Sequence, residues 1–412
     1  MPVKYWRGYL VAAILAVLTW ALIMFAASFS TLVDSFYPYL TRTIQDFLAG
    51  WSAGVDFCLW QLGVVILVAV VLATVVLMII FRWNFVQWLG WVLAAAMSIA
   101  LLHTGLYGLN YHAGPLADDI RLGVYQYSIE DLQEATRYYR DKANELADQM
   151  PRNPDGSLKF ESFETLGTKA GAGFEKLTRE EGYSVFAGKT TYTISDGNAQ
   201  TPDEKKNIPI KKLDWADMYT SMGITGITMP ITGEVAVNPQ IPAIALPFTM
   251  CHELSHRMCI AQERDANFAA FLACRANDDL QFQYSAYFMA YRYCFSALYS
   301  QTTAGATVAA ARIDAEVGPR FARDMRDYDA FFDANMKDNA ANFANAINDT
   351  YIKTSGDSAG VASYGEVCDL LVNIYILEEI VSEIDKGEEG SFDPYDKNQV
   401  DLDGIVGAMP RN

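Results

Sequence analysis

The segment FTMCHELSHRMCIAQERDAN, residues 248–267, concentrates side chains that hold metal ions and move protons. His252 and His256 are four residues apart, so on a helix both imidazoles lie on one face and can reach one ion at the ~2.0–2.1 Å of a zinc–nitrogen bond. Glu253 lies beside that face, where its carboxylate can take a proton from metal-bound water and pass it to a leaving amine. The pattern predicts hydrolysis of peptide bonds by a zinc-activated water, with Glu253 as the general base.

Histidine is scarce in this chain, which bears on the meaning of the pair. Of the four histidines, His103 and His112 belong to or adjoin an apolar segment in the first third of the chain, so the remainder has only His252 and His256. The alternative interpretation is a pair that packs or hydrogen-bonds on an ordinary helix. Spacing, the intervening glutamate and the helical context agree with one another and favour a metal site.

The third metal ligand has to be a carboxylate. No histidine follows His256, which excludes the ligand pattern HExxHxxGxxH. Cys259 shares the histidine face, but in an uninterrupted helix it lies ~10.5 Å along the axis from His252 and cannot converge on the same ion. The nearest acids are Glu263 and Asp265.

Helix geometry distinguishes these two acids. Successive helical residues turn by ~100°, so in a helix that begins before them Glu263 and Asp265 project ~200° apart and only one addresses the metal. The face of Glu263 carries mostly small residues such as Ala266, which allow a close approach, whereas the face of Asp265 carries Phe268 and Leu272. We therefore predict Glu263 as the third zinc ligand, with Asp265 as the second choice.

Three apolar segments precede this region and predict membrane helices. Residues 8–29, 59–81 and 86–108 contain no Asp, Glu, Lys or Arg, and each reaches the ~20 residues that span a bilayer. A cleaved signal peptide is the alternative for the first segment, but its apolar stretch exceeds the ~7–15 residues of a signal core. Residues 1–110 are therefore predicted to form a transmembrane region of three helices.

The basic residues predict how this region is oriented. Lys4 and Arg7 precede the first helix and Arg82 lies between the second and third, while the loop 34–56 carries one arginine against three aspartates. Because basic residues favour the cytoplasmic side, we predict a cytoplasmic N-terminus and a multi-pass protein of the cytoplasmic membrane. Three crossings then place the catalytic domain outside, and the lipid bilayer is a predicted partner.

The rest of the chain is predicted to be mostly α with a small β element. Residues 111–385 would form a soluble, zincin-like domain, and residues 386–412 an acidic tail. Residues 190–207 are predicted to be loop, and residues 223–239 to form one or two short strands with an edge position. Helices are expected near 128–150, 161–179, 247–259, 262–276, 280–299, 306–347 with interruptions, and 363–385.

Charge and cysteine content narrow the classes of partner. The formal net charge is -18, from 49 acids against 31 bases, and no basic stripe reverses it locally, so nucleic acid is excluded as a partner. The six cysteines form no CxxC pair and do not decide the redox compartment.

The predicted strands suggest how a peptide or protein substrate would bind. An edge strand beside the metal could pair with it backbone to backbone, and the residues of this candidate substrate strand are Thr225, Gly226, Ile227, Gly233, Glu234 and Asn238. A purely structural hairpin is the alternative. For the group that stabilises the oxyanion, the candidates are Tyr284 and Tyr364.

Several separated motifs carry a resemblance to a known family. They are LYGLNYHAGPL (106–116), TGITMPITGEVAVNPQIPAIALPFTMCHELSH (225–256), ERDANFAAFLAC (263–274) and SAGVASYGEVCDLL (358–371). Together they resemble an uncharacterised bacterial family, classed by its domain of unknown function, of three-helix membrane proteins with an HExxH metallopeptidase-like domain. The resemblance implies a zinc peptidase without an established substrate. Cys259 departs from it, because a glycine is expected there.

A second resemblance is local. ERDAN is similar to the ExxxD/N segment of CAAX prenyl endopeptidases and of ImmA-type metallopeptidases, in which the leading glutamate binds zinc. It implies that Glu263 is a ligand and that Asn267 supports the ligands from outside.

Two functions therefore stand as expectations. The first is a membrane-anchored zinc-dependent endopeptidase. The alternative is a non-catalytic, zinc-stabilised membrane sensor or assembly protein that keeps a metallopeptidase frame. Glu253 favours the enzyme, because a structural metal site needs no general base.

Overall fold

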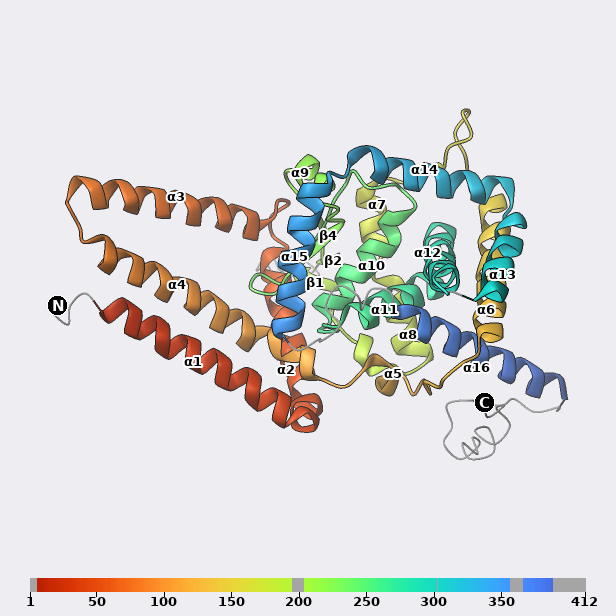
Figure 1. The fold of residues 1–412 in the computed structure, drawn as a ribbon, viewed down its shortest axis with the longest axis horizontal. Coiled ribbons are helices and arrows are strands. Elements are labelled where there is room, and N and C mark those ends of the chain that lie inside the picture. The colour runs from red at the N-terminus through yellow and green to blue at the C-terminus, as the bar shows by residue number, and fades with distance from the viewer. Residues whose placement is uncertain (1–5, 195–203, 302, 356–365, 388–412) are drawn as a thin grey trace.

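A computed structural model of the chain describes residues 6–194, 204–301, 303–355 and 366–387. The protein is mostly helical, with two small sheets, and three long apolar helices extend from one side of a helical domain (Figure 1). The mostly α class with a small β element is confirmed. Most of the predicted acidic tail lies outside the described residues.

The three apolar helices match the predicted membrane segments to within two residues. They are α1 (Arg7–Ser28), α3 (Leu59–Ile80) and α4 (Phe85–Leu106), all long and apolar enough to cross a membrane. At ~1.5 Å per residue each is ~33 Å long, close to the ~30 Å hydrocarbon core of a bilayer. Gly8 and Gly90 let α1 and α4 touch, since a Cβ on Gly8 would lie 2.5 Å from the carbonyl carbon of Gly90.

The segment between α1 and α3 corrects one expectation. Residues 34–56 were predicted to be loop, but most of them belong to α2 (Ser30–Ser52), which lies across the junction between the membrane helices and the domain (Figure 1). Its polar residues mark a packed face: Thr41 and Gln45 are fully buried and Arg42 is 7% exposed. Arg42, one of the charged residues that suggested a loop, therefore contacts the domain.

The membrane helices attach to the domain at three points. The C-terminal ends of α1 and α4 and the N-terminal end of α3 face it, while the N-terminus of the chain lies at the far end (Figure 1). Near their hairpin α3 and α4 meet, because Trp88 Nε1 donates to Thr74 Oγ1 at 3.1 Å. From there the two helices diverge toward the domain.

The helical domain is built around α11, which is buried along almost its whole length. Helix α6 begins with a capping box, in which Ser128 and Asp131 each accept a hydrogen bond from the other's backbone N–H group. The predicted helix 161–179 is two helices, because Ala170 and Gly171 interrupt it. The helices are α5 (Leu116–Asp119), α6 (Ile129–Gln149), α7 (Phe163–Lys169), α8 (Ala172–Glu180), α9 (Ala216–Ser221), α10 (Ala245–Arg257), α11 (Glu263–Ala276), α12 (Leu280–Tyr299), α13 (Ala304–Ala315), α14 (Pro319–Asn335), α15 (Asp338–Ser355), α16 (Val367–Gly387) and the 3-10 turns η2 (Gly108–His112) and η3 (Ser184–Phe186).

The sheets are short. The predicted strands are confirmed as β4 (Gly226–Met229) and β5 (Glu234–Val237), an antiparallel pair in a sheet of order β3-β5-β4, so β4 is an edge strand. The strand β3 (Ile210–Lys212) runs parallel to β5 and was not predicted. The prediction of a loop at 190–207 was wrong at both ends of this segment, which pair as the strands β1 (Thr191–Ile194) and β2 (Glu204–Asn207).

A buried carboxylate joins the sheet to a membrane helix. Glu234 on β5 accepts hydrogen bonds from the backbone N–H groups of Leu59 and Trp60, the first two residues of α3, at 2.8 and 3.0 Å. Lys211 on β3 neutralises it at 2.6 Å, and both side chains are almost completely buried. A carboxylate at this position satisfies unpaired donors and complements the helix dipole.

Candidate metal centre

A tight turn brings the two helices of the centre together. Helix α10 ends at Arg257, and α11 begins at Glu263, so both predicted helices begin and end within two residues of the expected positions. Between them Cys259 has a left-handed backbone with φ of 71°. This conformation is the one that a glycine adopts at a helix end, which explains why a glycine is expected there. The turn is retained with cysteine in its place.

The structure brings His252, His256 and Glu263 to one point. The two Nε2 atoms are 3.1 Å apart, and Glu263 Oε2 lies 3.3 Å from Nε2 of His252 and 3.4 Å from Nε2 of His256. Three ligand atoms of a tetrahedral zinc site, each at ~2.0–2.1 Å from the ion, lie ~3.3 Å from one another. The triangle therefore has the size that such an ion requires.

The surroundings of His256 and Glu263 fit the same interpretation, whereas Nδ1 of His252 has no hydrogen-bond partner among the described residues. His256 Nδ1 lies 2.8 Å from the carbonyl oxygen of Ile260, an acceptor, so this nitrogen carries the proton and Nε2 presents a lone pair. Glu263 Oε2 is buried and accepts no hydrogen bond within the described part of the chain. A cation at the centre of the triangle would satisfy both lone pairs.

Charge at the centre points the same way. Burial opposes ionisation of Glu263, yet the two histidines outweigh it and hold the pKa of this carboxyl well below its usual value. Burial likewise opposes protonation of His256, but the Glu263 carboxylate raises the pKa of its imidazole to about 9. The buried carboxylate thus stabilises positive charge here, whether a proton or a metal ion.

Glu253 lies between the centre and the edge strand. Its Oε2 accepts a hydrogen bond from Thr228 Oγ1 on β4 at 2.8 Å. A Cβ on Gly226 would lie 2.5 Å from Oε1, so only glycine lets this carboxylate approach the strand so closely. Burial raises the pKa of Glu253, despite the opposing effect of the two histidines. A carboxyl with a raised pKa is typical of a general base near neutral pH.

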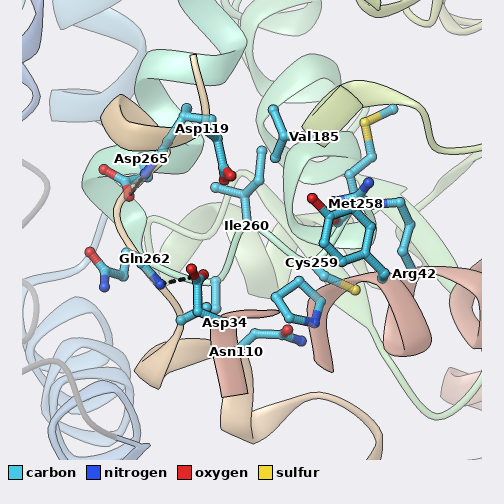
Figure 2. A pocket seen from close by; sticks show the side chains of 16 residues that line it. Asp34, Arg42, Asn110, Asp119, Val185, Met258, Cys259, Ile260, Gln262 and Asp265 are labelled. Atoms are coloured by element: carbon cyan, nitrogen blue, oxygen red, sulfur yellow. Dashed lines mark hydrogen bonds between the residues drawn. The ribbon is translucent and has the colours of Figure 1, made fainter. Parts of the chain in front are cut away.

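Asp265 is placed away from the histidines. Its Oδ2 accepts from the backbone N–H of Leu116 at 2.8 Å, and Oδ1 accepts from Arg264 Nε at 2.8 Å. Figure 2 shows it at a small pocket that is also lined by Asp34, Asp119 and the 258–262 turn. The two acids of the first turn of α11 thus point in different directions, as helix geometry requires.

Asn267 lies one turn beyond Glu263 on α11. Its Oδ1 accepts from the hydroxyl of Tyr293 at 3.3 Å, while its buried Nδ2 has no hydrogen-bond acceptor among the described residues. Burial raises the pKa of Tyr293, and Tyr328 and the Glu263 carboxylate raise it further.

The candidate substrate strand divides into two groups. Gly226 and Ile227 belong to the edge strand β4, Thr225 directly precedes it, and all three are partly exposed. The others have structural partners: Gly233 forms a left-handed turn packed on α2, Glu234 caps α3, and Asn238 is buried and donates to Thr220 Oγ1 and the Ile224 carbonyl oxygen. Only the first group offers a free strand edge.

Of the two oxyanion candidates, Tyr284 does not lie at the metal centre. Tyr284 is fully buried in the core, where its hydroxyl donates to Asp324 at 2.6 Å, and Asp324 also pairs with Arg152. Tyr364 lies outside the described residues.

A different tyrosine lies at the centre and was missed. Tyr107, which follows the last residue of α4, has its hydroxyl 3.4 Å from His256 Nδ1. It is almost completely buried, with Tyr111 and Ile352 in the same cluster. Tyr107 and Tyr111 both lie in LYGLNYHAGPL, one of the motifs that carry the family resemblance. This motif was the sequence signal that could have pointed to Tyr107.

Comparison with known proteins gives a family and no function. Among proteins of curated function no match is found, and no solved structure matches either. The metallopeptidase resemblance thus rests on the residues of the chain alone. One family does match, over residues 33–372, from α2 into α16, and it is described as a protein of unknown function. The chain belongs to this family, DUF3810.

Proposed function

We propose that this protein is a membrane-anchored zinc-dependent endopeptidase. The observation that carries the proposal is the triangle of His252, His256 and Glu263, with a buried carboxylate, Glu253, beside it. The donor set of two imidazoles and one carboxylate is typical of catalytic zinc, which keeps a position open for water or substrate. When bound, zinc supplies Lewis-acid chemistry: it lowers the pKa of water toward ~7 and polarises a carbonyl oxygen.

The residues of the chain supply the remaining steps. The edge strand β4 offers unpaired backbone groups to an extended peptide and so aligns the scissile bond beside the centre. Thr228 holds Oε2 of Glu253, which leaves Oε1 to take the proton of the attacking water and return it to the leaving amine. Tyr107 and the Ile260 carbonyl group orient His256.

The non-catalytic alternative accounts less well for Glu253. Burying a carboxylate costs free energy unless it is paired, and among the described residues Glu253 receives a single side-chain hydrogen bond, from Thr228. A sensor or assembly protein that used zinc only for stability would gain nothing from this group. We infer that Glu253 is kept in this buried position, despite its cost in free energy, because it acts in catalysis.

Metal removal tests the proposed function. We expect the purified full-length protein to contain zinc and to hydrolyse members of a randomised peptide library. Chelation should abolish hydrolysis, and added zinc should restore it, because the ion supplies the Lewis acid. The measurements are elemental analysis and mass spectrometry of the peptides. Zinc-loaded protein that cleaves no peptide would contradict the proposal and favour the sensor.

We also propose that the N-terminus is cytoplasmic and the domain external. This orientation rests on the basic residues Lys4, Arg7 and Arg82. Protease added to intact spheroplasts is therefore expected to digest the domain while a cytoplasmic marker survives. If the domain resists until the membrane is lysed, the orientation is the reverse and the substrate is cytoplasmic.

A further inference from the structure

The metal centre lies at the end of a membrane helix. Tyr107 directly follows α4, and its hydroxyl is 3.4 Å from His256 Nδ1, so no linker separates the site from the membrane region. A helix as long as α4 fills the ~30 Å hydrocarbon core, and the head-group layer beyond it is about 5–8 Å thick on each side. The centre therefore lies at the level of the lipid head groups.

The opposite side of the site is tied to the membrane as well. Glu234 on β5 caps the first turn of α3, and β5 is hydrogen-bonded to the edge strand β4 that contacts Glu253. The junction helix α2 joins both sides: Gln45 donates to the Pro230 carbonyl oxygen between β4 and β5, and Arg42 donates to the Met258 carbonyl oxygen after α10. The site cannot move far from the bilayer surface.

Exposed apolar side chains gather at this junction. Helix α2 packs one face on the domain and exposes large apolar groups on the other, as Phe47 (72% exposed) and Trp51 (66%) show. Helix α9, with the preceding Trp215, and helix α15 add further exposed groups. The set, here called the junction rim, is Leu32, Phe36, Tyr39, Leu40, Phe47, Trp51, Trp215, Met218, Phe343 and Ile347. Aromatic and aliphatic groups at the ends of membrane helices are typical of an interfacial surface.

Helix α15 connects the two sides of the site. Just before it, the backbone N–H of Lys337 donates to the Ser221 carbonyl oxygen at the end of α9. Near its other end Ile352 is buried with Tyr107 and Ala261. In Figure 1 α15 lies across the ends of the membrane helices, like α2. The junction rim therefore includes two residues of a helix, α15, whose end packs against Tyr107 at the site.

The membrane helices leave one side open to lipid. No residue of the most apolar stretch of α3 is buried against the rest of the described protein, and α3 diverges from α4 toward the domain (Figure 1). Because lipid-facing helices associate through packing, an unpacked helix is available to another transmembrane segment.

We propose that the substrate is itself a membrane-anchored polypeptide, cut on the side of the domain within about five residues of the bilayer, since an extended chain advances ~3.3 Å per residue across the head-group layer. This inference rests on the proposed peptidase function and adds the substrate class. The junction rim keeps the site at the head groups, and β4 pairs with the first extended residues that leave the membrane. A soluble peptide lacks this alignment and has to reach the site from bulk water.

Full-length protein in proteoliposomes tests the inference with three reporters. The first is a single transmembrane helix followed by a randomised segment and a fluorescent domain. In the second, a flexible Gly/Ser spacer of about 40 residues separates the helix from the same segment. The third has no transmembrane helix. Mass spectrometry of the released fragments locates the cuts.

The comparison of the short-spacer and long-spacer reporters tests whether the site cuts close to the bilayer. Tethering raises the effective concentration of both anchored reporters above that of the soluble one, and it does so most where the spacer length matches the height of the site above the bilayer. We expect the short-spacer reporter to be cut at least about tenfold faster than the long-spacer reporter, with the soluble one slowest. Equal rates for both anchored reporters, or faster cleavage of the soluble one, would overturn the inference and leave the peptidase standing. If zinc-loaded protein cuts none of the three, the peptidase itself fails.

A matched pair of variants tests the junction rim. Phe47→Asp places a charge on the exposed face of α2, and Val308→Asp places the same charge on an equally apolar but distant position of α13. We expect Phe47→Asp to lower cleavage of the short-spacer reporter several-fold and to leave the soluble reporter unaffected, whereas Val308→Asp changes neither. Equal effects of the two variants on the short-spacer reporter would contradict a role for the rim.

Discussion

Glu253→Gln is expected to abolish hydrolysis while the protein keeps its zinc and its fold. Glutamine has nearly the same shape, so it fits against Gly226 and can still accept the hydrogen bond of Thr228. It cannot take a proton from water. The loss of general-base catalysis should lower kcat about 10²–10⁴-fold. Steady-state kinetics on a peptide that the wild type cleaves measures the change.

The control for this variant removes a carboxylate elsewhere. Glu145 on α6 is exposed, and Glu145→Gln should leave kcat unchanged. Zinc content and thermal unfolding of Glu253→Gln, compared with wild type, show whether the centre and the fold survive. Unchanged turnover in a correctly folded, zinc-loaded Glu253→Gln protein would sink the peptidase interpretation.

The second large effect concerns the third ligand. Glu263→Ala removes one of three groups in the triangle, whereas Asp265→Ala removes a carboxylate that accepts from the Leu116 N–H group and from Arg264. Partners outside the ligand set typically account for 10–100-fold in metal affinity, so loss of a direct ligand should cost more than about 100-fold. Asp265→Ala should keep its zinc and lose only stability, by about 1–3 kcal/mol for the unsatisfied donor.

Competition with a zinc chelator of known affinity measures both effects. Glu263→Gln serves as a second variant, because it preserves side-chain volume in case the alanine protein does not fold. Full zinc retention in both Glu263 variants, together with zinc loss in Asp265→Ala, would reverse the assignment.

Local periodicity predicted the elements that carry the histidines. The bounds of α10, α11 and α12 follow from apolar spacing and from turn residues, so one sequence was enough for them. It failed for α2, where buried polar residues such as Arg42 and Gln45 imitate a loop, and for β3, where Lys211 is buried because Glu234 compensates its charge. Such pairs join distant segments, and no local pattern contains them.

The surroundings of the site were harder to predict than its ligands. His252, His256 and Glu263 are close in sequence, so helix geometry alone brings them together. Tyr107 is 149 residues from His256 in sequence, and it reaches the site only because α4 ends there. Tyr284 was chosen by residue type, and its position in the core depends on Asp324 and on how α12 and α14 pack, which its local sequence does not indicate.

The cap on α3 is expected to make the sheet responsive to bilayer thickness. A membrane helix that is longer than the hydrocarbon core tilts to match it, at a cost of fractions of a kcal/mol per Å. The first turn of α3 is held by Glu234, which is buried and paired with Lys211, so a tilt of the helix pulls on β5 rather than on a loose linker. Through the ladder between β5 and β4, that force reaches the strand against which Glu253 rests. We therefore expect a change in lipid composition to shift the position of Glu253.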